Sequence, residues 1–432
     1  MMRSDRELVK YCIDKMIERG AEKAQCYLKH NKKHELNVDA GEMKLLRTTF
    51  DTNILLKAII NDQKGDLKIN KKDEGSIDRA VDQVIELAQS SLPDKANDIA
   101  DKQPPKEFTS GREKADLDVM YDRLHDFVLY EKERYPKTMI EKGIVDFTQS
   151  NILIQNSNGV DFAGNRGLYS FSVMFTSKEG EKASSFNYSG CASKELDKPL
   201  HEYASVDMLL KQSGEQIHTS AFPGKMVGDV IITPDCFSSF IYYITAYLHD
   251  YSLISGSSIY KDKLNEKIAN ESLTLHSYPR SPEIAKNYFF TRDGFEAQNM
   301  TIIDKGMLKS FLLSQYGANK TGKPKAVNSG GCYIVEPGTA AFEEMVSSID
   351  KGLLLCRFSG GNPSDNGDFS GVAKNSYLIE NGKIAKPVNE TMIAGNLAEM
   401  INNIANISKE RIDYGSEIYP WIQVKGITIS GK

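Results

Sequence analysis

Long apolar runs, paired cysteines and an excess of basic charge are all missing from this sequence. No stretch approaches the roughly 18 uninterrupted apolar residues of a membrane-spanning helix, so we expect no membrane association. The charged first residues lack an apolar segment, which predicts that they are not a secretory signal. The six cysteines are scattered and form no CxxC pair, which favours free thiols in a reducing cytoplasm over disulfides or a zinc ribbon.

The charge balance is slightly acidic, because 54 basic and 59 acidic residues give a net charge of −5. A protein built to grip a phosphate backbone is usually basic, so we expect no nucleic-acid partner. Hydrophobic residues make up 40% of the chain and charged residues 26%, as in ordinary globular proteins. A length of 432 residues predicts two or three domains.

The first half of the chain shows two successive patterns of helices and strands. Ser4 and Glu7 form a capping box before a helix that Gly20 ends. Hairpin strands follow, and a second helix buries the face from Ile77 to Ala88. We predict an N-terminal α+β domain over 1–91, a proline-containing linker over 92–111 and a central α+β domain over 112–222. Their strands are predicted at 25–29, 35–38, 43–49, 53–61, 66–70, 143–148, 152–156, 168–176 and 182–188.

The remaining segment, 223–432, is predicted to be a β-rich C-terminal domain. A strand at 229–233 meets Pro234, and an aromatic-rich helix is expected from there to about Ser255. Asn381-Gly382 is a strong hairpin signal between short strands. The predicted fold class is therefore α+β, with helices packed on antiparallel sheets in the N-terminal region and a β-rich C-terminal domain.

The most glycine-dense segment is Phe358–Gly371, FSGGNPSDNGDFSG. It lacks the GK[ST] ending of a nucleotide P-loop. Two interpretations stay open: glycines that permit a positive-φ loop, or exposed main chain lining a groove where a substrate strand pairs. His249 and Asp250 are adjacent on the predicted helix and so do not face each other as a catalytic dyad. From residue chemistry alone, the sequence does not identify an active site.

The stretch from Phe358 to Ile404 and the ending IYPWIQVKGITISGK resemble the TldD/PmbA family, in which PmbA is also called TldE. Weaker similarity covers AFPGKMVGDVIITPD and the hairpins around Met43–Ile60. The resemblance implies a cytosolic two-subunit metallopeptidase that trims leader peptides or degrades small unfolded proteins. In it, the TldD-type subunit carries HExxxH on a helix and a later cysteine ligand, and the PmbA/TldE subunit lacks them. An older family label is "modulator of DNA gyrase".

Aligning Pro234 with the family's proline places the metal motif on Tyr242, Tyr243 and Tyr247. A neutral phenol is a poor zinc ligand compared with imidazole, and Tyr243 has no carboxylate to act as a base. No cysteine follows Cys356. We therefore expect no catalytic residue, metal or cofactor in this chain, with zinc carried by a TldD-type partner.

The leading hypothesis is a metal-free PmbA/TldE-like subunit that binds an extended peptide as part of a homodimer or a heterodimer with a TldD-type subunit. Its peptide-binding candidates are Phe358, Ser359, Gly360, Gly361, Asn362, Gly367 and Asp368. One alternative is a self-sufficient metallopeptidase that uses His249, Asp250 and Glu266 as ligands. Another is a non-enzymatic regulator of a DNA topoisomerase. The aromatic side chains at 237, 240, 242, 243 and 247 are expected to suit a dimer interface.

Overall fold

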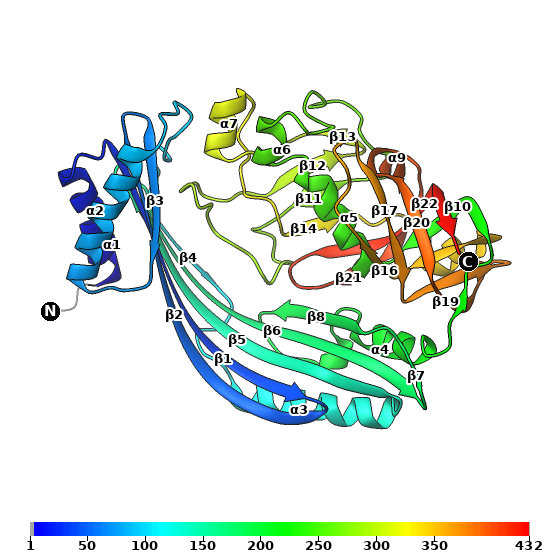
Figure 1. The fold of residues 1–432 in the computed structure, drawn as a ribbon. Helices are drawn as coiled ribbons and strands as arrows, with labels where there is room; N and C mark the ends of the chain where they lie inside the picture. Colours follow the sequence, from blue (N-terminus) through cyan, green and yellow to red (C-terminus); the bar gives the residue numbers. More distant parts are fainter. Residues whose placement is uncertain (1–3, 432) are drawn as a thin grey trace.

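The computed structural model describes residues 4–431, and its strands form two large sheets (Figure 1). The first sheet is long and strongly curved, and the C-terminal region lies on its concave side. Helices pack on the sheets throughout, so the predicted α+β class is confirmed. Within residues 4–431, no helix combines the length and apolarity needed to cross a lipid bilayer.

The first sheet has eight strands in the described part of the chain. Its central order is β3-β2-β1-β5-β6-β4, and β7 and β8 also pair with β6. Neighbouring strands are antiparallel except for β4, which runs parallel to β6. The strands are β1 (Lys23–Asp39), β2 (Glu42–Ile60), β3 (Gln63–Ile69), β4 (Lys106–Ser110), β5 (Thr138–Asn156), β6 (Asp161–Glu179), β7 (Lys182–Ala183) and β8 (Asn187–Ser193).

The main strands of this sheet are longer than the sequence predicts. The runs predicted at 25–29 and 35–38 are the two ends of the 17-residue β1, and β2, β5 and β6 each have 19 residues. The prediction broke β1 at the polar residues Asn31–Lys33. Hydrogen bonding to β2 and β5 on both sides holds those residues in the strand regardless of their polarity.

Two groups of helices cover the first sheet. The helices α1 (Asp5–Glu18) and α2 (Glu74–Ser90) bury one face against the upper halves of β1 and β2. The predicted capping box is present, since Glu7 N–H donates to Ser4 Oγ and Ser4 N–H donates to the Glu7 carboxylate. The lower half packs against α3 (Leu117–Arg134), η1 (Leu200–Glu202) and α4 (Val206–Glu215).

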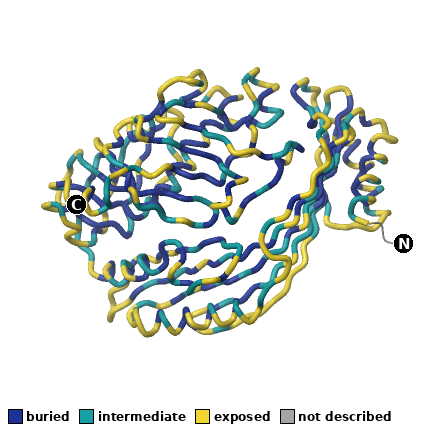
Figure 2. The backbone as a smooth tube through the Cα atoms, turned by 180° about the vertical axis from the view of Figure 1, so that it is seen from behind, coloured by how far each residue is buried: buried dark blue, intermediate teal, exposed yellow. Residues whose placement is uncertain are grey.

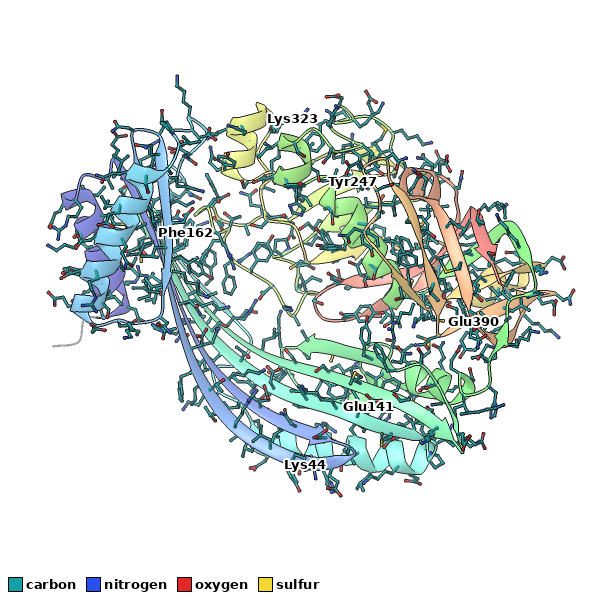
Figure 3. All side chains as sticks on the ribbon, viewed as in Figure 1. Lys44, Glu141, Phe162, Tyr247, Lys323 and Glu390 are labelled. Carbon is teal, nitrogen blue, oxygen red and sulfur yellow. The ribbon has the colours of Figure 1, made fainter. Side chains whose placement is uncertain are left out.

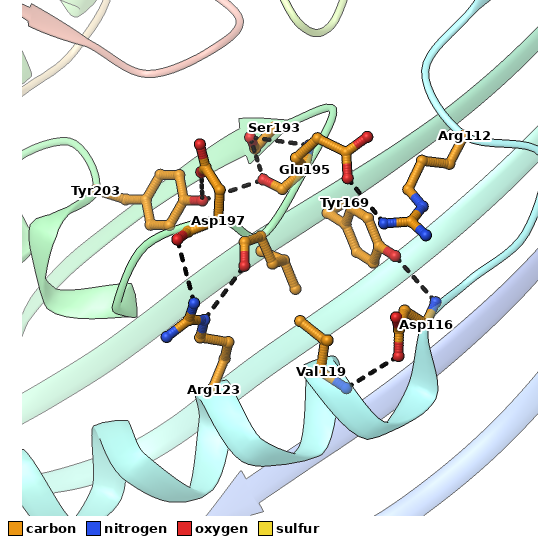
Figure 4. Close-up of polar contacts among 10 residues, drawn as sticks. Arg112, Asp116, Val119, Arg123, Tyr169, Ser193, Glu195, Asp197 and Tyr203 are labelled. Atoms are coloured by element: carbon orange, nitrogen blue, oxygen red, sulfur yellow. Dashed lines mark hydrogen bonds and ion pairs between the residues drawn. The ribbon is translucent and has the colours of Figure 1, made fainter.

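Polar contacts join α3 to the segment that follows β8 (Figure 4). Arg123 donates to the main-chain carbonyls of Leu196 and Asp197 at 3.2 Å each. The Tyr203 hydroxyl donates to Asp197 at 2.9 Å, and Arg112 forms an ion pair with Glu195. These contacts fix the chain between β8 and α4. In the first sheet, β8 is the strand that forms one wall of a cavity.

The second sheet contains fourteen strands within residues 4–431, in the main order β13-β12-β11-β14-β22-β10-β15-β18-β19-β9. Its remaining strands form a branch in which β16 pairs with β17, β17 with β20, and both β20 and β21 with β22. The strands are β9 (Ser220–Ala221), β10 (Lys225–Ile232), β11 (Leu275–Ser277), β12 (Met300–Asp304), β13 (Met307–Leu308), β14 (Tyr333–Val335), β15 (Lys351–Leu355), β16 (Arg357–Gly360), β17 (Asp368–Lys374), β18 (Ser376–Glu380), β19 (Lys383–Asn389), β20 (Thr391–Asn396), β21 (Ile404–Asp413) and β22 (Ile418–Ser430).

The C-terminal region has its own hydrophobic core. The helices α5 (Pro234–Ala246) and α9 (Leu397–Asn402) bury apolar side chains against this sheet, and α8 (Phe342–Ser347) packs in a smaller core with β15 and β18. The predicted hairpin forms between β18 and β19, where Asn381 and Gly382 adopt φ values of 51° and 71°. The short helices α6 (Asp250–Ile254) and α7 (Gln315–Thr321) lie at the upper edge of the region (Figure 1).

The two sheets meet through aromatic packing at the upper end of the concave face. Phe289 stacks on Phe108 with ring centroids 5.3 Å apart, and Phe290 packs against Phe162, which Figure 3 labels on the sheet. Gly164 lies beneath Phe289, where a Cβ atom would stand 2.7 Å from the ring. The outer edge of the curved sheet, residues 44–51 of β2, is exposed (Figure 2).

The strands from 1–91 and those from 112–222 other than β9 belong to one continuous sheet. The segment predicted as a linker, 92–111, includes β4, which pairs with β6. The second sheet begins with β9 at Ser220–Ala221, next to the predicted boundary at 222. All six cysteines are buried and unpaired.

Candidate functional site

The site is built around α5. Thr233 caps this helix with an extended backbone, and Pro234 occupies the first turn, where a missing N–H costs no helical hydrogen bond. The predicted continuation to Ser255 is wrong, because α5 ends at Ala246. His249 is extended (φ −89°, ψ 168°), and the Leu312 N–H donates to the Leu248 carbonyl at 2.9 Å. Main-chain pairing with a distant segment thus replaces the next helical turn.

The tyrosines at the motif positions do not converge on a common point. Tyr242 is 68% exposed, whereas Tyr247 is buried. Tyr243 packs edge-on against Phe240 and Phe358. The Tyr247 hydroxyl donates a hydrogen bond of 2.7 Å to the Ser364 carbonyl, and Figure 3 labels this residue at the end of α5. Burial raises the pKa of the Tyr247 phenol, so it stays protonated.

The aromatic residues proposed for a dimer interface are mostly internal. Phe237 and Phe240 are fully buried in the core of the C-terminal region, and Tyr247 is buried beside them. Tyr242 is the exposed member of the set. The prediction that these side chains form an interface core is therefore wrong for Phe237 and Phe240, because their own chain already covers them.

The glycine-dense segment is a hairpin rather than an open loop. Residues Arg357–Gly360 form β16 and Asp368–Lys374 form β17, with Gly360 opposite Gly371. The Phe358 ring lies over both glycines, where Cβ atoms would stand 2.5 and 2.6 Å from ring atoms. The same ring packs against Phe240 of α5 at 5.4 Å. These glycines make room for the aromatic contact that docks the hairpin on α5.

The tip of the hairpin is held by polar contacts. The Asn396 and Asn366 side-chain amides donate to the Asp368 carboxylate at 2.9 and 2.8 Å, and these hydrogen bonds lower the pKa of Asp368. Gly367 is buried and bonded to the start of α9 through its carbonyl. Among the peptide-binding candidates, the exposed residues are Ser359, Gly360, Gly361, Asn362 and Asp368.

Two strand edges close to this hairpin have no partner strand in the described part of the chain, although two N–H groups of β8 are already bonded: Ala192 N–H donates to the Tyr414 carbonyl at 2.9 Å, and Tyr188 N–H donates to the Asn187 side chain at 3.0 Å. Within residues 4–431, β16 pairs only with β17, and β8 pairs only with β6. A cavity of about 330 Å³ lies between β8 of the first sheet and α5 and β16 of the second. Its wall on the first sheet includes residues 187–192, and its wall on the second includes Asp235, Ser238 and Arg357. Main-chain groups from two different sheets thus border one recessed space.

The cavity is lined by two carboxyl groups, Asp235 and Glu417, and by two cations, Lys286 and Arg357. Ser205 Oγ donates to Asp235 at 2.6 Å, and burial raises the pKa of Asp235 and of Glu417. Arg357 stacks on Phe186 at 4.2 Å and donates to the Phe186 carbonyl at 2.7 Å. Burial also raises the pKa of Cys356, which keeps its thiol protonated. The lining contains no histidine among the described residues, so the cavity offers hydrogen bonding and charge but no activated nucleophile.

Sequence reasoning missed this cavity. Asp235 and Arg357 each lie one residue from a position that the sequence analysis had singled out, Pro234 and Phe358. Asp235 is bonded to Ser205 and Arg357 to Phe186, which are distant in the chain, and no local pattern reports such contacts. No motif or pattern in the sequence singled out Glu417.

The residues of the alternative metal site are not brought together. His249 and Asp250 line a second cavity of about 210 Å³, but Asp250 accepts hydrogen bonds from the Ser314 N–H and hydroxyl at the start of α7. Glu266 forms an ion pair with Lys263 at 2.7 Å. Across residues 4–431, no three His, Cys, Asp or Glu side chains are gathered as a metal-binding group. The tyrosines of α5 and their neighbours therefore do not fit a zinc ion.

Comparisons with known proteins agree on one family. The PmbA/TldA metallopeptidase C-terminal domain matches residues 223–431. A metalloprotease PmbA homolog of Buchnera aphidicola is 32% identical over 208 residues, which cover 45% of this chain and 46% of that relative. This match therefore spans about half of the relative's length. Metalloprotease PmbA of Escherichia coli O157:H7 is 24% identical over 415 residues, covering 89% and 88% of the two chains.

A solved structure extends the similarity to the whole fold. The crystal structure of TldE from Thermococcus kodakarensis matches with a TM-score of 0.84 and 18% identity, covering 99% of each chain. At this identity the structural match shows the shared fold alone.

Proposed function

Because this chain belongs to the TldD/PmbA family, we propose that it is the metal-free, TldE-type component of a two-subunit TldD/TldE-type peptidase of the cytoplasm. In this role the chain binds an extended peptide, such as a leader peptide or a small unfolded protein. A TldD-type partner carrying HExxxH supplies the zinc site and the hydrolytic step.

The metal-free role rests on α5. A zinc ligand must present an unprotonated donor, and phenols at neutral pH are protonated. Tyr247 also uses its hydroxyl to hold Ser364, while Tyr242 faces solvent. This difference in side-chain chemistry at the family's ligand positions is the observation that carries the proposal.

The peptide-binding role is supported by the edge of β16, by the part of the β8 edge that Tyr414 does not cover, and by the cavity between the two strands. An extended peptide added to a strand edge gains affinity from main-chain hydrogen bonds, and these are largely independent of its sequence. Arg357 and Asp235 in the cavity wall then provide fixed polar contacts for peptide groups.

The test is to purify the full chain, measure its zinc content by mass spectrometry, and assay cleavage of an unfolded peptide with and without a TldD-type subunit. We expect no stoichiometric zinc, no cleavage by this chain alone, and cleavage by the mixture. A mixture in which the partner's HExxxH glutamate is replaced by glutamine serves as the control and should be inactive. Turnover by this chain alone with tightly bound zinc would contradict the proposal.

A further inference from the structure

A group of basic side chains lies at the upper end of the concave face, where the segment after Phe290 approaches the first sheet. We name it the basic hollow, and it consists of Lys29, Lys57, Lys68, Arg166 and Arg292. Lys57, Lys68 and Arg292 line a cavity of about 340 Å³ together with Tyr27 and Leu55. Its wall also carries one further cation, Lys64, and two carboxylates, Asp66 and Asp293. The cavity is therefore lined by apolar groups and by more cations than carboxylates.

Strand register places the other two members beside this cavity. Side chains alternate between the faces of a strand, so Tyr27 and Lys29 of β1 point to the same face. Arg166 of β6 pairs with Ser150, which pairs with Asn31 two residues beyond Lys29. Between them, Gly164 has no side chain and lies under Phe289. Lys29 and Arg166 thus lie on the same face of the sheet, two residues apart in register, and their long side chains extend toward Arg292.

None of the five members of the basic hollow forms an ion pair with a residue in 4–431. Asp66, the cross-strand neighbour of Lys57, is instead paired with Lys64 at 3.0 Å in the same cavity wall, and Arg47 farther along the sheet lies 2.8 Å from Glu35. Within the hollow, Arg166 donates through Nη1 to the Asn287 carbonyl, whereas its buried Nε atom has no hydrogen-bond partner among the described residues. Burial lowers the pKa of Lys29, and the nearby Arg166 and Arg292 lower it further. Cations that crowd one another in a recess are stabilised by an anionic ligand.

We propose that the basic hollow binds carboxylate groups of an extended acidic peptide. Arg292 presents a planar donor group that matches a carboxylate, Arg166 adds positive charge and its unpartnered Nε atom beside it, and Tyr27 and Leu55 provide apolar contact for the adjoining part of the peptide. A nucleic acid is disfavoured, because the chain carries a net charge of −5 and the cations lie in a recess rather than along an exposed stripe. This inference rests on the proposed peptide-binding function and specifies the chemistry of the peptide.

The test measures binding of fluorescent unfolded peptides of equal length to the purified full chain by anisotropy. One peptide has acidic side chains and an amidated C-terminus, a second is neutral with a free C-terminal carboxylate, and a third is neutral and amidated. We expect at least one carboxylate-bearing peptide to bind roughly tenfold more tightly than the neutral amide. The first two peptides distinguish a side-chain carboxylate from a terminal one.

Variants then locate the site. Arg292 is exposed, so Arg292→Gln should leave the fold intact while weakening the favoured peptide roughly tenfold, and Lys57→Gln should have a similar effect. Lys32→Gln is the matched control, since Lys32 lies on β1 with its side chain on the opposite face from Lys29. The salt dependence of binding should decrease in Arg292→Gln and stay unchanged in Lys32→Gln.

Two results would overturn the inference. Equal affinity for all three peptides, or affinity unaffected by Arg292→Gln and Lys57→Gln, would refute the carboxylate site and leave the peptide-binding function intact. Failure of every peptide to bind would refute both together. The outcomes therefore separate an error about the hollow from an error about the proposed function.

Discussion

The Tyr247 hydroxyl donates a hydrogen bond of 2.7 Å to the main-chain carbonyl of Ser364, a residue 117 positions later in the chain. The contact joins the end of α5 to the tip of the β16–β17 hairpin. The family resemblance implies that Tyr247 corresponds to the second histidine of the metal motif, and in this structure its side chain holds the hairpin. The hairpin tip is thus positioned by the chain itself.

Replacing Tyr247 with phenylalanine removes this hydrogen bond without changing the packing of the ring. We expect the free energy of unfolding to fall by about 1 kcal/mol, as for the loss of one neutral hydrogen bond, and the hairpin tip to exchange its amide hydrogens faster. Denaturant titration and hydrogen exchange measure the two effects. Tyr242→Phe is the control, because Tyr242 is 68% exposed, and it should behave like the unaltered protein.

A methyl group at Gly360 should disrupt the docking of the hairpin on α5. The added Cβ would stand 2.5 Å from a Phe358 ring atom, so the ring must move away from Phe240. We expect Gly360→Ala to destabilise the protein by about 1–3 kcal/mol, measured by thermal or chemical unfolding. Gly361→Ala has open space around its Cβ and should have a much smaller effect. Equal losses in the two variants would contradict this account.

Glu131 on α3 should make the stability depend on pH. The side chain is buried, one carboxylate oxygen has no hydrogen-bond partner among the described residues, and burial raises its pKa from 4.5 to about 7. Between these values the folded protein holds more protons than the unfolded one. The free energy of unfolding should therefore fall as the pH rises from about 4.5 to about 7, and the loss is complete above that range.

Glu131→Gln removes this titration. At pH 8 we expect a gain in stability on the order of 2 kcal/mol relative to the unaltered protein, and near pH 4.5 little difference. Glu133→Gln is the control, because Glu133 is exposed on the same helix. If Glu131→Gln and Glu133→Gln gave parallel stability curves from pH 4.5 to 8, the buried carboxyl would not be the source of the pH dependence.

Metal removal should leave the isolated chain unchanged. Because residues 4–431 gather no group of three His, Cys, Asp or Glu side chains that could hold a metal, we expect a chelator to extract no ion and the melting temperature to be the same with and without EDTA. A metal that binds the folded state raises its stability by mass action, so a lower melting temperature in EDTA would reveal a site. Differential scanning calorimetry at constant ionic strength makes the comparison.

The sequence predicted features that depend on local chemistry. The Ser4–Glu7 capping box, the Asn381-Gly382 turn and the buried face of α2 are all present, because each depends on residues a few positions apart. The length of β1 could not be predicted in the same way, since its polar middle is held by β2 and β5 rather than by its own side chains.

The same distinction applies to the candidate site. The glycine-dense segment and the tyrosines of α5 stood out in the sequence, and the structure places both in one aromatic contact through Phe358. The end of α5 at Ala246 and the cavity beside Asp235 were not predicted. Both depend on pairing with distant segments, Leu312 in the first case and β8 in the second.

The cavity between β8 and β16 has a mechanical consequence. Its opposite walls are carried by separate sheets, and the chain passes from one to the other through a single covalent segment, between α4 and β9. A bound peptide that is hydrogen-bonded to β8 and to β16 would resist separation of the two sheets for as long as it stayed bound. Peptide binding should therefore restrict the motion of one sheet relative to the other. The bound state should then show a narrower distribution of distances between spin labels placed on the two cavity walls.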